Sequence, residues 1–241
     1  MLIKTSGIVF RQQKYGDTSV ILDVYTQAVG MRSYILHGVR KARSRIPISA
    51  VQVMSMIDLV AYDRSDKALN RVKEVKTGFI YQSIPFNVIK GAVGLFMVEV
   101  ARKTIREEEP NEGLYRYLCN SFQWLDQQEG PIGNFHLYFL CGLSQYLGFF
   151  PDGQCTPETP YFDLQEGSFV AQAPRHPNYL QEEHSAILGK ILRSDALDCC
   201  ALRMQRQDRQ ILLRNLLDFY RLHLASFPEI QAYRVLETVL R

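Results

Sequence analysis

The spacing of apolar residues changes near residue 80, and this change limits the folds open to the chain. Before it, apolar and polar residues alternate with a period of two, as where Val20, Leu22 and Val24 fall on one face. After it, apolar residues recur every three or four positions, as in Val88, Ala92 and Phe96. The period of two predicts strands, and the spacing of three or four predicts amphipathic helices. We therefore expect an α+β chain with a β-rich first part and a helical second part.

The first part contains five candidate strands, at residues 3–12, 18–26, 31–37, 51–62 and 72–79. Gly16 and Gly30 mark the first two turns, where glycine tolerates the positive φ that other residues resist. Five short strands in about 80 residues are typical of a small closed barrel. We predict a five-stranded OB-fold.

The second part is predicted to be all-helical, apart from an irregular insertion at about residues 151–177 that holds five of the ten prolines. A short hairpin is expected at 161–170. Helices are expected at residues 86–106, 113–128, 134–149, 179–192, 205–224 and 231–240. The predicted domains are residues 1–80 and 81–241.

The charges are distributed unevenly between these parts. The net charge of +3 hides 13 Lys and Arg against 6 Asp and Glu in residues 1–80, and 15 against 19 in the rest. Such asymmetry indicates a basic binding module joined to a different one.

The strongest cationic run is the connection between two predicted strands at residues 38–45, Gly-Val-Arg-Lys-Ala-Arg-Ser-Arg. Four cations with no acid among them are typical of a surface that holds a polyanion such as a nucleic-acid backbone. The alternative is a solvated surface loop. The candidate DNA contacts are Arg40, Lys41, Arg43 and Arg45, with Arg32 and Lys14 as weaker candidates.

Three tyrosines lie among these cations, Tyr15, Tyr25 and Tyr34. Single-stranded nucleic acid is commonly held by cations on phosphates and aromatic rings under bases. Each tyrosine alternatively packs into the barrel. A second arginine cluster, spanning Arg203–Arg221, is interpreted either as an auxiliary patch or as an ordinary soluble surface.

Sequence signatures of enzymes are missing from the chain. It has no glycine-rich nucleotide loop, nucleophile elbow or His-Glu-x-x-His motif. His136 and His223 stand beside apolar neighbours and are predicted to be core or interface residues. We expect a protein that is not an enzyme, with no catalytic residue, no small-molecule substrate and no cofactor.

Composition is that of a globular protein, with 46% hydrophobic and 22% charged residues. No apolar stretch reaches the roughly 18 residues of a membrane span, so no membrane association is expected. The first residues do not resemble a secretory signal, and five scattered cysteines suggest no disulfide framework. We expect a cytoplasmic protein.

The sequence resembles the bacterial recombination mediator family RecO. The resemblance covers nearly the whole chain and rests on the order of several pieces rather than on any one. They are Gly7-Ile8-Val9-Phe10-Arg11, Tyr15-Gly16-Asp17, residues 19–26, Gly30, residues 37–44, residues 143–152, Arg214-Asn215-Leu216-Leu217 and Tyr220-Arg221-Leu222-His223.

This resemblance implies an N-terminal OB-fold and a C-terminal helical domain. It also implies binding of single- and double-stranded DNA, annealing of complementary strands, and cooperation with RecR and SSB in loading RecA for DNA repair and recombination after DNA damage. The alternatives are an RNA-binding OB-fold protein, or an interaction adaptor whose basic loop is incidental.

The chain departs from the family in the insertion. Many members carry two Cys-x-x-Cys pairs there, which form a tetrahedral zinc site. This chain keeps Cys155 alone, followed by Thr-Pro-Glu, and His176 and His184 do not restore the spacing. We predict no structural metal and expect the insertion to be mobile or held by Tyr161, Phe162 and Phe169.

Overall fold

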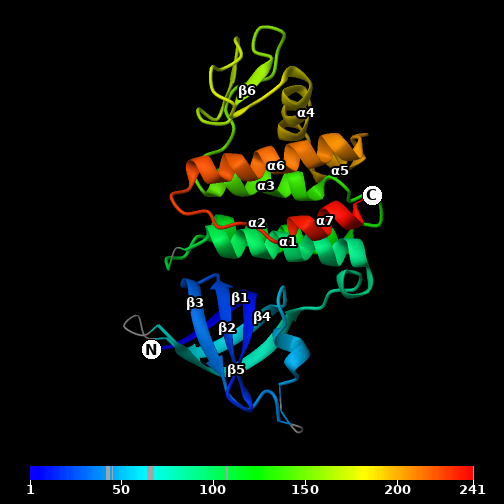
Figure 1. The fold of residues 1–241 in the computed structure, drawn as a ribbon. Helices are drawn as coiled ribbons and strands as arrows, with labels where there is room; N and C mark the ends of the chain where they lie inside the picture. The colour runs from blue at the N-terminus through cyan, green and yellow to red at the C-terminus, as the bar shows by residue number, and fades with distance from the viewer. Residues whose placement is uncertain (42–43, 45, 64–67, 107, 241) are drawn as a thin grey trace. The chain divides into compact units, whose positions relative to one another are not determined.

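The N-terminal part is a closed five-stranded barrel (Figure 1). The structure is a computed structural model and describes residues 1–241 except 42–43, 45, 64–67, 107 and 241. The strands are β1 (Leu2–Tyr15), β2 (Ser19–Thr26), β3 (Gly30–Leu36), β4 (Met56–Tyr62) and β5 (Asn70–Phe79). They close in the order β1-β2-β3-β5-β4. β3 and β5 are parallel, and the other pairs are antiparallel. The predicted OB-fold is confirmed.

The side chains at every second position of the strands fill the barrel, as the apolar pattern with a period of two predicts. Val20, Leu22 and Val24 are at most 1% exposed. The strand β1 pairs with β4 through residues 2–8 and with β2 through residues 7–15, and its register with β2 shifts between Val9 and Arg11. Gly7 allows close packing there, because a Cβ at this position would lie 2.5 Å from Val24 Cγ1.

The connection from β3 to β4 differs from the sequence prediction. The strand expected at residues 51–62 begins only at Met56, and a 3₁₀ helix, η1 (Ile48–Val51), precedes it. Val51 is fully buried in the barrel core. Tertiary packing thus overrides the extended preference of a β-branched residue.

The six predicted helices are present in the expected order, with ends shifted by a few residues. The helices are α1 (Val88–Thr104), α2 (Glu112–Gln127), α3 (Phe135–Tyr146), α4 (Glu182–Arg193), α5 (Ala196–Ala201), α6 (Arg206–His223) and α7 (Tyr233–Val239), with the 3₁₀ helix η2 (Ile84–Phe86) before α1. The short helix α5 was not predicted from the sequence. The helix expected from residue 179 starts at Glu182, because Tyr179 and Leu180 form a strand instead.

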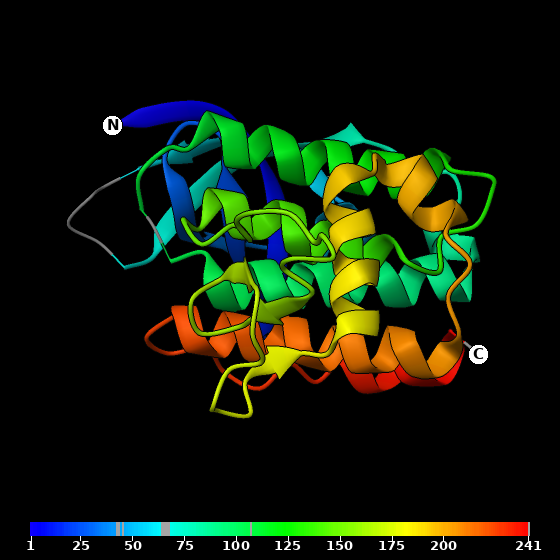
Figure 2. The same ribbon diagram turned by 90° about the horizontal axis from the view of Figure 1, so that it is seen from above.

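The insertion forms a small antiparallel sheet of β6 (Tyr161–Asp163), β7 (Ser168–Val170) and β8 (Tyr179–Leu180), in the order β7-β6-β8. The predicted hairpin is β6–β7. Phe162 is fully buried, and its ring centroid lies 4.9 Å from that of Phe169 and 5.8 Å from that of Phe219. Apolar packing therefore holds the insertion to α6, and in Figure 2 α4 runs crosswise to this helix.

By internal contacts the chain forms two compact units, residues 1–87 with 98–126, and residues 88–97 with 127–241. The first joins the barrel to α2. The second is built on α3 and α6, where the Tyr220 hydroxyl donates to the Leu140 carbonyl at 2.7 Å. The division falls inside α1, after Met97.

Candidate nucleic-acid interface

The cationic connection after β3 is fixed to the turn between β1 and β2. The Arg40 backbone N–H donates to the Thr18 carbonyl at 3.0 Å, and its guanidinium donates to the Asp17 carbonyl at 3.2 Å. The Lys41 N–H donates to the Gly38 carbonyl at 3.2 Å, closing a tight turn in which Gly38 has a φ of 72°. These backbone bonds place Arg40 and Lys41 beside the β1–β2 turn.

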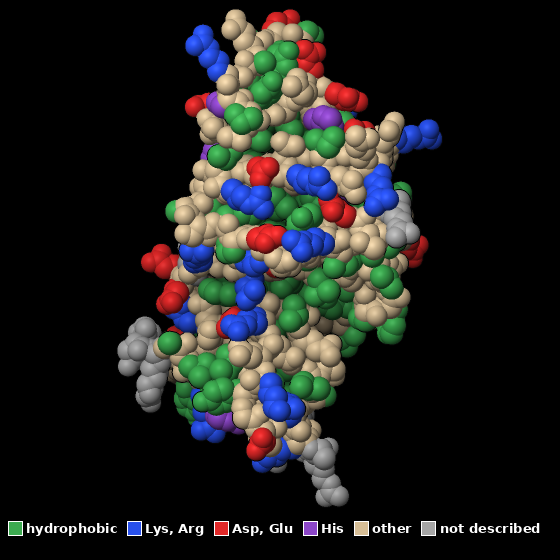
Figure 3. Space-filling model, in the orientation of Figure 1, with side chains coloured by type: hydrophobic (Ala, Val, Ile, Leu, Met, Phe, Trp, Pro, Cys, Tyr) green, Lys and Arg blue, Asp and Glu red, His purple; other side chains and the backbone are tan. Residues whose placement is uncertain are grey.

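Three of the predicted cations therefore meet at one end of the barrel, which we call the cationic tip: Lys14, Arg40 and Lys41. All three are exposed. Within the described residues, none forms an ion pair with a carboxylate. Figure 3 shows Lys and Arg side chains at the lower end of the barrel, with an acidic side chain and a histidine between them. Arg43 and Arg45 lie outside the described residues.

Arg32 is in a different environment from the tip. Its side chain is 14% exposed and pairs with two carboxylates, with Nε 3.7 Å from Asp63 Oδ1 and Nη1 3.3 Å from Glu108 Oε2. Nη1 also donates to the Met31 carbonyl at 2.9 Å. A mostly buried guanidinium with such partners stabilises the local structure and offers little charge to a ligand.

The three candidate stacking tyrosines separate into two kinds. Tyr25 and Tyr34 are fully buried, so they pack the protein and cannot receive a base. Tyr25 lies on the outer side of the barrel, stacked on Phe10 with centroids 5.9 Å apart, and Tyr115 of α2 covers it at 6.3 Å. Tyr15 is 52% exposed, at the end of β1 next to the cationic tip.

Residues that the sequence did not indicate lie beside Tyr15. Tyr15 is paired with Ser19 across β1 and β2, and Ser19 Oγ lies 3.1 Å from Nδ1 of the exposed His37. His37 directly precedes the cationic run in the sequence, and its residue type alone does not place it beside Tyr15. The register between the strands places His37 next to Ser19 and Tyr15. The apolar pattern of a single strand does not reveal how three strands are aligned.

The second arginine cluster is largely engaged within the helical unit. Arg214 Nη2 lies 2.7 Å from Glu237 Oε1, and the Arg206 guanidinium donates to the Glu237 carbonyl at 2.9 Å. Arg209 donates to Asn134 Oδ1 at 3.0 Å, and Arg221 pairs with Asp218. These contacts favour a structural role over an auxiliary binding patch.

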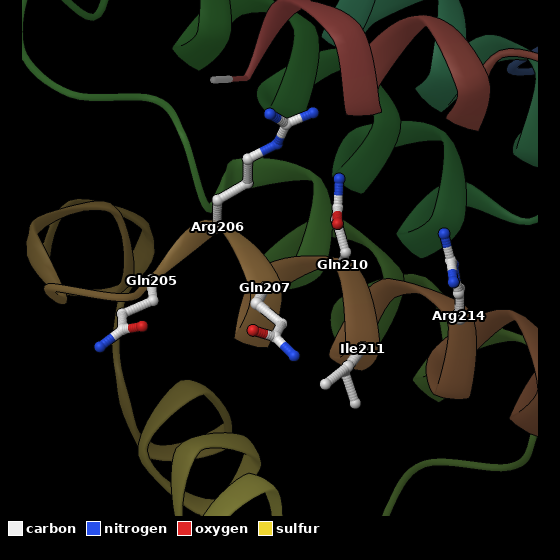
Figure 4. A pocket seen from close by; sticks show the side chains of 6 residues that line it. All are labelled: Gln205, Arg206, Gln207, Gln210, Ile211 and Arg214. Atoms are coloured by element: carbon white, nitrogen blue, oxygen red, sulfur yellow. The ribbon is translucent and has the colours of Figure 1, made fainter.

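An open depression of about 640 Å³ lies along α6 between these arginines. Its lining is polar except for one isoleucine: Gln205, Arg206, Gln207, Gln210, Ile211 and Arg214. Figure 4 shows Arg206, Gln210 and Arg214 pointing to one side of the helix, and Gln207 and Ile211 to the other. The two arginines are thus turned towards Glu237 of α7.

The insertion does not offer a zinc-ligand set within the described residues. No group of three or more His, Cys, Asp and Glu side chains in them could hold a metal ion. Cys155 packs against α4 at Gly189. A Cβ added to Gly189 would lie 2.9 Å from the Cβ of Cys155. His176 Nε2 lies 3.2 Å from Asp163 Oδ2, and His184 Nε2 lies 3.3 Å from Asp208 Oδ1. The residues present do not fit a tetrahedral zinc site.

No helix in the described parts of the chain combines the length and the apolar character needed to cross a membrane.

Comparison with known proteins covers both parts of the chain. The family described as Recombination protein O N terminal matches residues 1–80, and Recombination protein O C terminal matches residues 86–229. Proteins named DNA repair protein RecO are similar along nearly their whole length. Those of Phocaeicola vulgatus and Bacteroides fragilis are 33% and 34% identical over 237 and 238 residues, 98% of each chain. That of Flavobacterium johnsoniae is 33% identical over 242 residues, 99% of each chain. The chain therefore belongs to the recombination protein O family.

Proposed function

We propose that this protein is a DNA-binding recombination mediator of DNA repair. It binds single- and double-stranded DNA, anneals complementary strands and, with RecR and SSB, helps to load RecA. Family membership and the names of its relatives support a role in repair and recombination. The observation that carries DNA binding is the cationic tip, where exposed cations gather on an OB-fold barrel.

The proposed mechanism needs no covalent step. Arg40 and Lys41, with Arg43 and Arg45 next in the sequence, contact phosphates and release the counterions condensed on them, and Lys14 is a weaker contact. Two strands held on such a surface repel each other less, which lowers the barrier to base pairing. No catalytic residue or cofactor is required. Arg32 contributes least, because binding DNA would require its guanidinium to leave Asp63 and Glu108.

The two predicted domains divide the work in this proposal. Residues 1–80 provide the DNA surface, and residues 81–241 form the helical domain. The protein acts in the cytoplasm, where bacterial DNA lies.

The test is the salt dependence of single-stranded DNA binding. About four phosphate contacts give a slope near −3 in a plot of log K against log salt concentration, at about −0.7 per phosphate. The double variant Arg40→Ala/Lys41→Ala is expected to make the slope shallower by about 1.4. Adding Arg43→Ala and Arg45→Ala brings it towards zero. Fluorescence anisotropy at several salt concentrations measures this.

The matched control is Lys73→Ala/Lys76→Ala, which removes the same charge from exposed positions of β5 outside the tip. Its slope is expected to stay at the wild-type value. Equal loss in both double variants would show that net charge alone matters, and would remove the tip from the proposal. Preference for RNA over DNA oligonucleotides of one sequence would favour the RNA-binding alternative. A flat salt response in the wild type would favour an adaptor.

A further inference from the structure

The outer face of β1, β2 and β3 is covered at one end and open at the other. At the covered end, Ile8, Phe10 and Tyr25 are at most 2% exposed, and Tyr115 of α2 lies over Tyr25. At the open end, the same face continues through Tyr15, Ser19 and His37, and no element of the described residues buries Tyr15 or His37.

Strand register defines the residues of this open end. Gln13 pairs with Ile21, and Ile21 pairs with Ile35, so these three form a row across the strands. The next row is Tyr15 and Ser19, continued by His37 through the Ser19 hydroxyl. Ile21 and Ile35 are partly exposed, whereas Gln13 and His37 are exposed. We call this surface the Tyr15 face: Tyr15, Gln13, Ile21, Ile35 and His37.

Cations border this face on the side of the tip. Arg40 is tied to the carbonyl of Asp17, two residues after Tyr15. Lys41 follows Arg40, whereas Lys14 lies on the other side of β1 from Tyr15, because neighbouring side chains alternate along a strand. An aromatic ring with aliphatic neighbours, edged by cations, matches the two chemical parts of a nucleotide. The cations suit the phosphate, and the apolar surface suits the flat side of the base.

We propose that the Tyr15 face binds the unpaired bases of single-stranded nucleic acid, with one base stacked on the Tyr15 ring. This inference rests on the proposed function, because the cationic tip brings the backbone to the face. A duplex hides the flat sides of its bases within the helical stack, so it engages the cations but not Tyr15. The face thus gives the protein a distinction between single strands and duplexes that cations alone cannot make.

The experiment compares three probes bound to the full-length chain: an oligothymidylate, an abasic sugar-phosphate strand of equal length, and a duplex. Tyr15→Ala is expected to weaken oligothymidylate binding about 5- to 150-fold, the range found for loss of one stacked base. Binding of the abasic strand and of the duplex is expected to change less than twofold. Tyr15→Phe keeps the ring and is expected to bind oligothymidylate like the wild type.

Tyr62→Ala is the matched control. Tyr62 is 47% exposed on β4, and it pairs with Leu2 at the opposite end of β1 from Tyr15. The two tyrosines therefore lie at opposite ends of this 14-residue strand. This variant should bind all three probes like the wild type.

Three results would overturn the proposal. They are an unchanged affinity of Tyr15→Ala for oligothymidylate, an equal loss on all three probes, and a loss in Tyr15→Phe as large as in Tyr15→Ala. The proposed function fails separately, if the wild type binds none of the probes in a salt-dependent manner. Circular dichroism of each variant shows whether a lost affinity is a lost fold.

Discussion

At the scale of single residues, Asp126 shows how one carboxylate can hold two segments of the chain together. Its side chain accepts backbone N–H groups of Gln82 and Ser83 at 2.8 Å and of Ile84 at 2.9 Å. The residue is 3% exposed. Burial alone would raise the pKa of its carboxyl, but the backbone donors together hold that pKa below its usual value. Asp126 thus joins the end of α2 to the segment after β5.

Asp126→Asn is expected to lower the free energy of unfolding at pH 7 by about 2–3 kcal/mol, because buried N–H groups lose a charged acceptor. Since the folded pKa is depressed, the stabilisation is complete above the unfolded pKa of about 3.9. It is lost as the pH falls through the folded value. The difference between wild type and variant should therefore shrink below pH 4, as measured by urea unfolding at each pH.

Asp218→Asn is the control for this prediction, because Asp218 is exposed and pairs with Arg221 on one helix. Asp218→Asn should lower the free energy of unfolding by less than about 1 kcal/mol. A cost for Asp126→Asn that is as small as this, or that does not change with pH, would contradict the role given to the carboxylate.

At the scale of elements, the insertion shows how strands of two or three residues become ordered. Ser185 of α4 accepts the Phe162 N–H at 2.9 Å and donates to the Leu180 carbonyl at 3.0 Å. One buried hydroxyl thus joins β6 and β8 to the helix. Phe162 and Phe169 are buried as expected, whereas Tyr161 is partly exposed and donates to Glu182 at 2.8 Å. Packing and this hydroxyl hold together a segment without a metal-ligand set among the described residues.

Ser185→Ala is expected to cost about 1–3 kcal/mol of unfolding free energy, because the buried Phe162 N–H loses its acceptor. Hydrogen exchange at Phe162 should become faster. Ser194→Ala, at the end of the same helix and with its hydroxyl on the Lys190 carbonyl, should change stability by at most about 0.5 kcal/mol. Equal effects of the two variants would show that the Ser185 hydroxyl does not order the insertion.

At the scale of the whole molecule, the barrel is completed by a segment outside its own strands. Phe10 and Tyr25 lie on its outer side and are at most 2% exposed, with Tyr115 of α2 over Tyr25. The compact unit around the barrel accordingly includes residues 98–126. A barrel cut at residue 80 would present these rings to water.

A fragment of residues 1–126 is therefore expected to be more stable than a fragment of residues 1–80. Covering two large aromatic side chains contributes about 3–6 kcal/mol. Urea unfolding followed by far-ultraviolet circular dichroism measures the difference. Tyr115→Ala in the longer fragment should remove part of the additional stability that this fragment has over residues 1–80. Equal midpoints for both fragments would show that α2 does not stabilise the barrel.

Part of the candidate site was readable from residue types alone. Arg40 and Lys41 are exposed, as expected, because lysine and arginine are rarely buried without a partner. His136, predicted to be a core or interface residue, is fully buried, and burial lowers its pKa to about 3. Arg32 and Tyr25 were not readable in this way. Their surroundings depend on Glu108 and Tyr115, more than 70 positions later in the sequence.

The sequence by itself determined the barrel, the order of the helices other than α5, and the place of the cationic connection. Each depends on local periodicity or charge, which decides at every position whether a side chain meets water or the core. Tertiary structure decided which tyrosine stays exposed, which arginine is paired, and where the strand after η1 begins. Those outcomes depend on which distant segment covers a given face, and no local pattern encodes that choice.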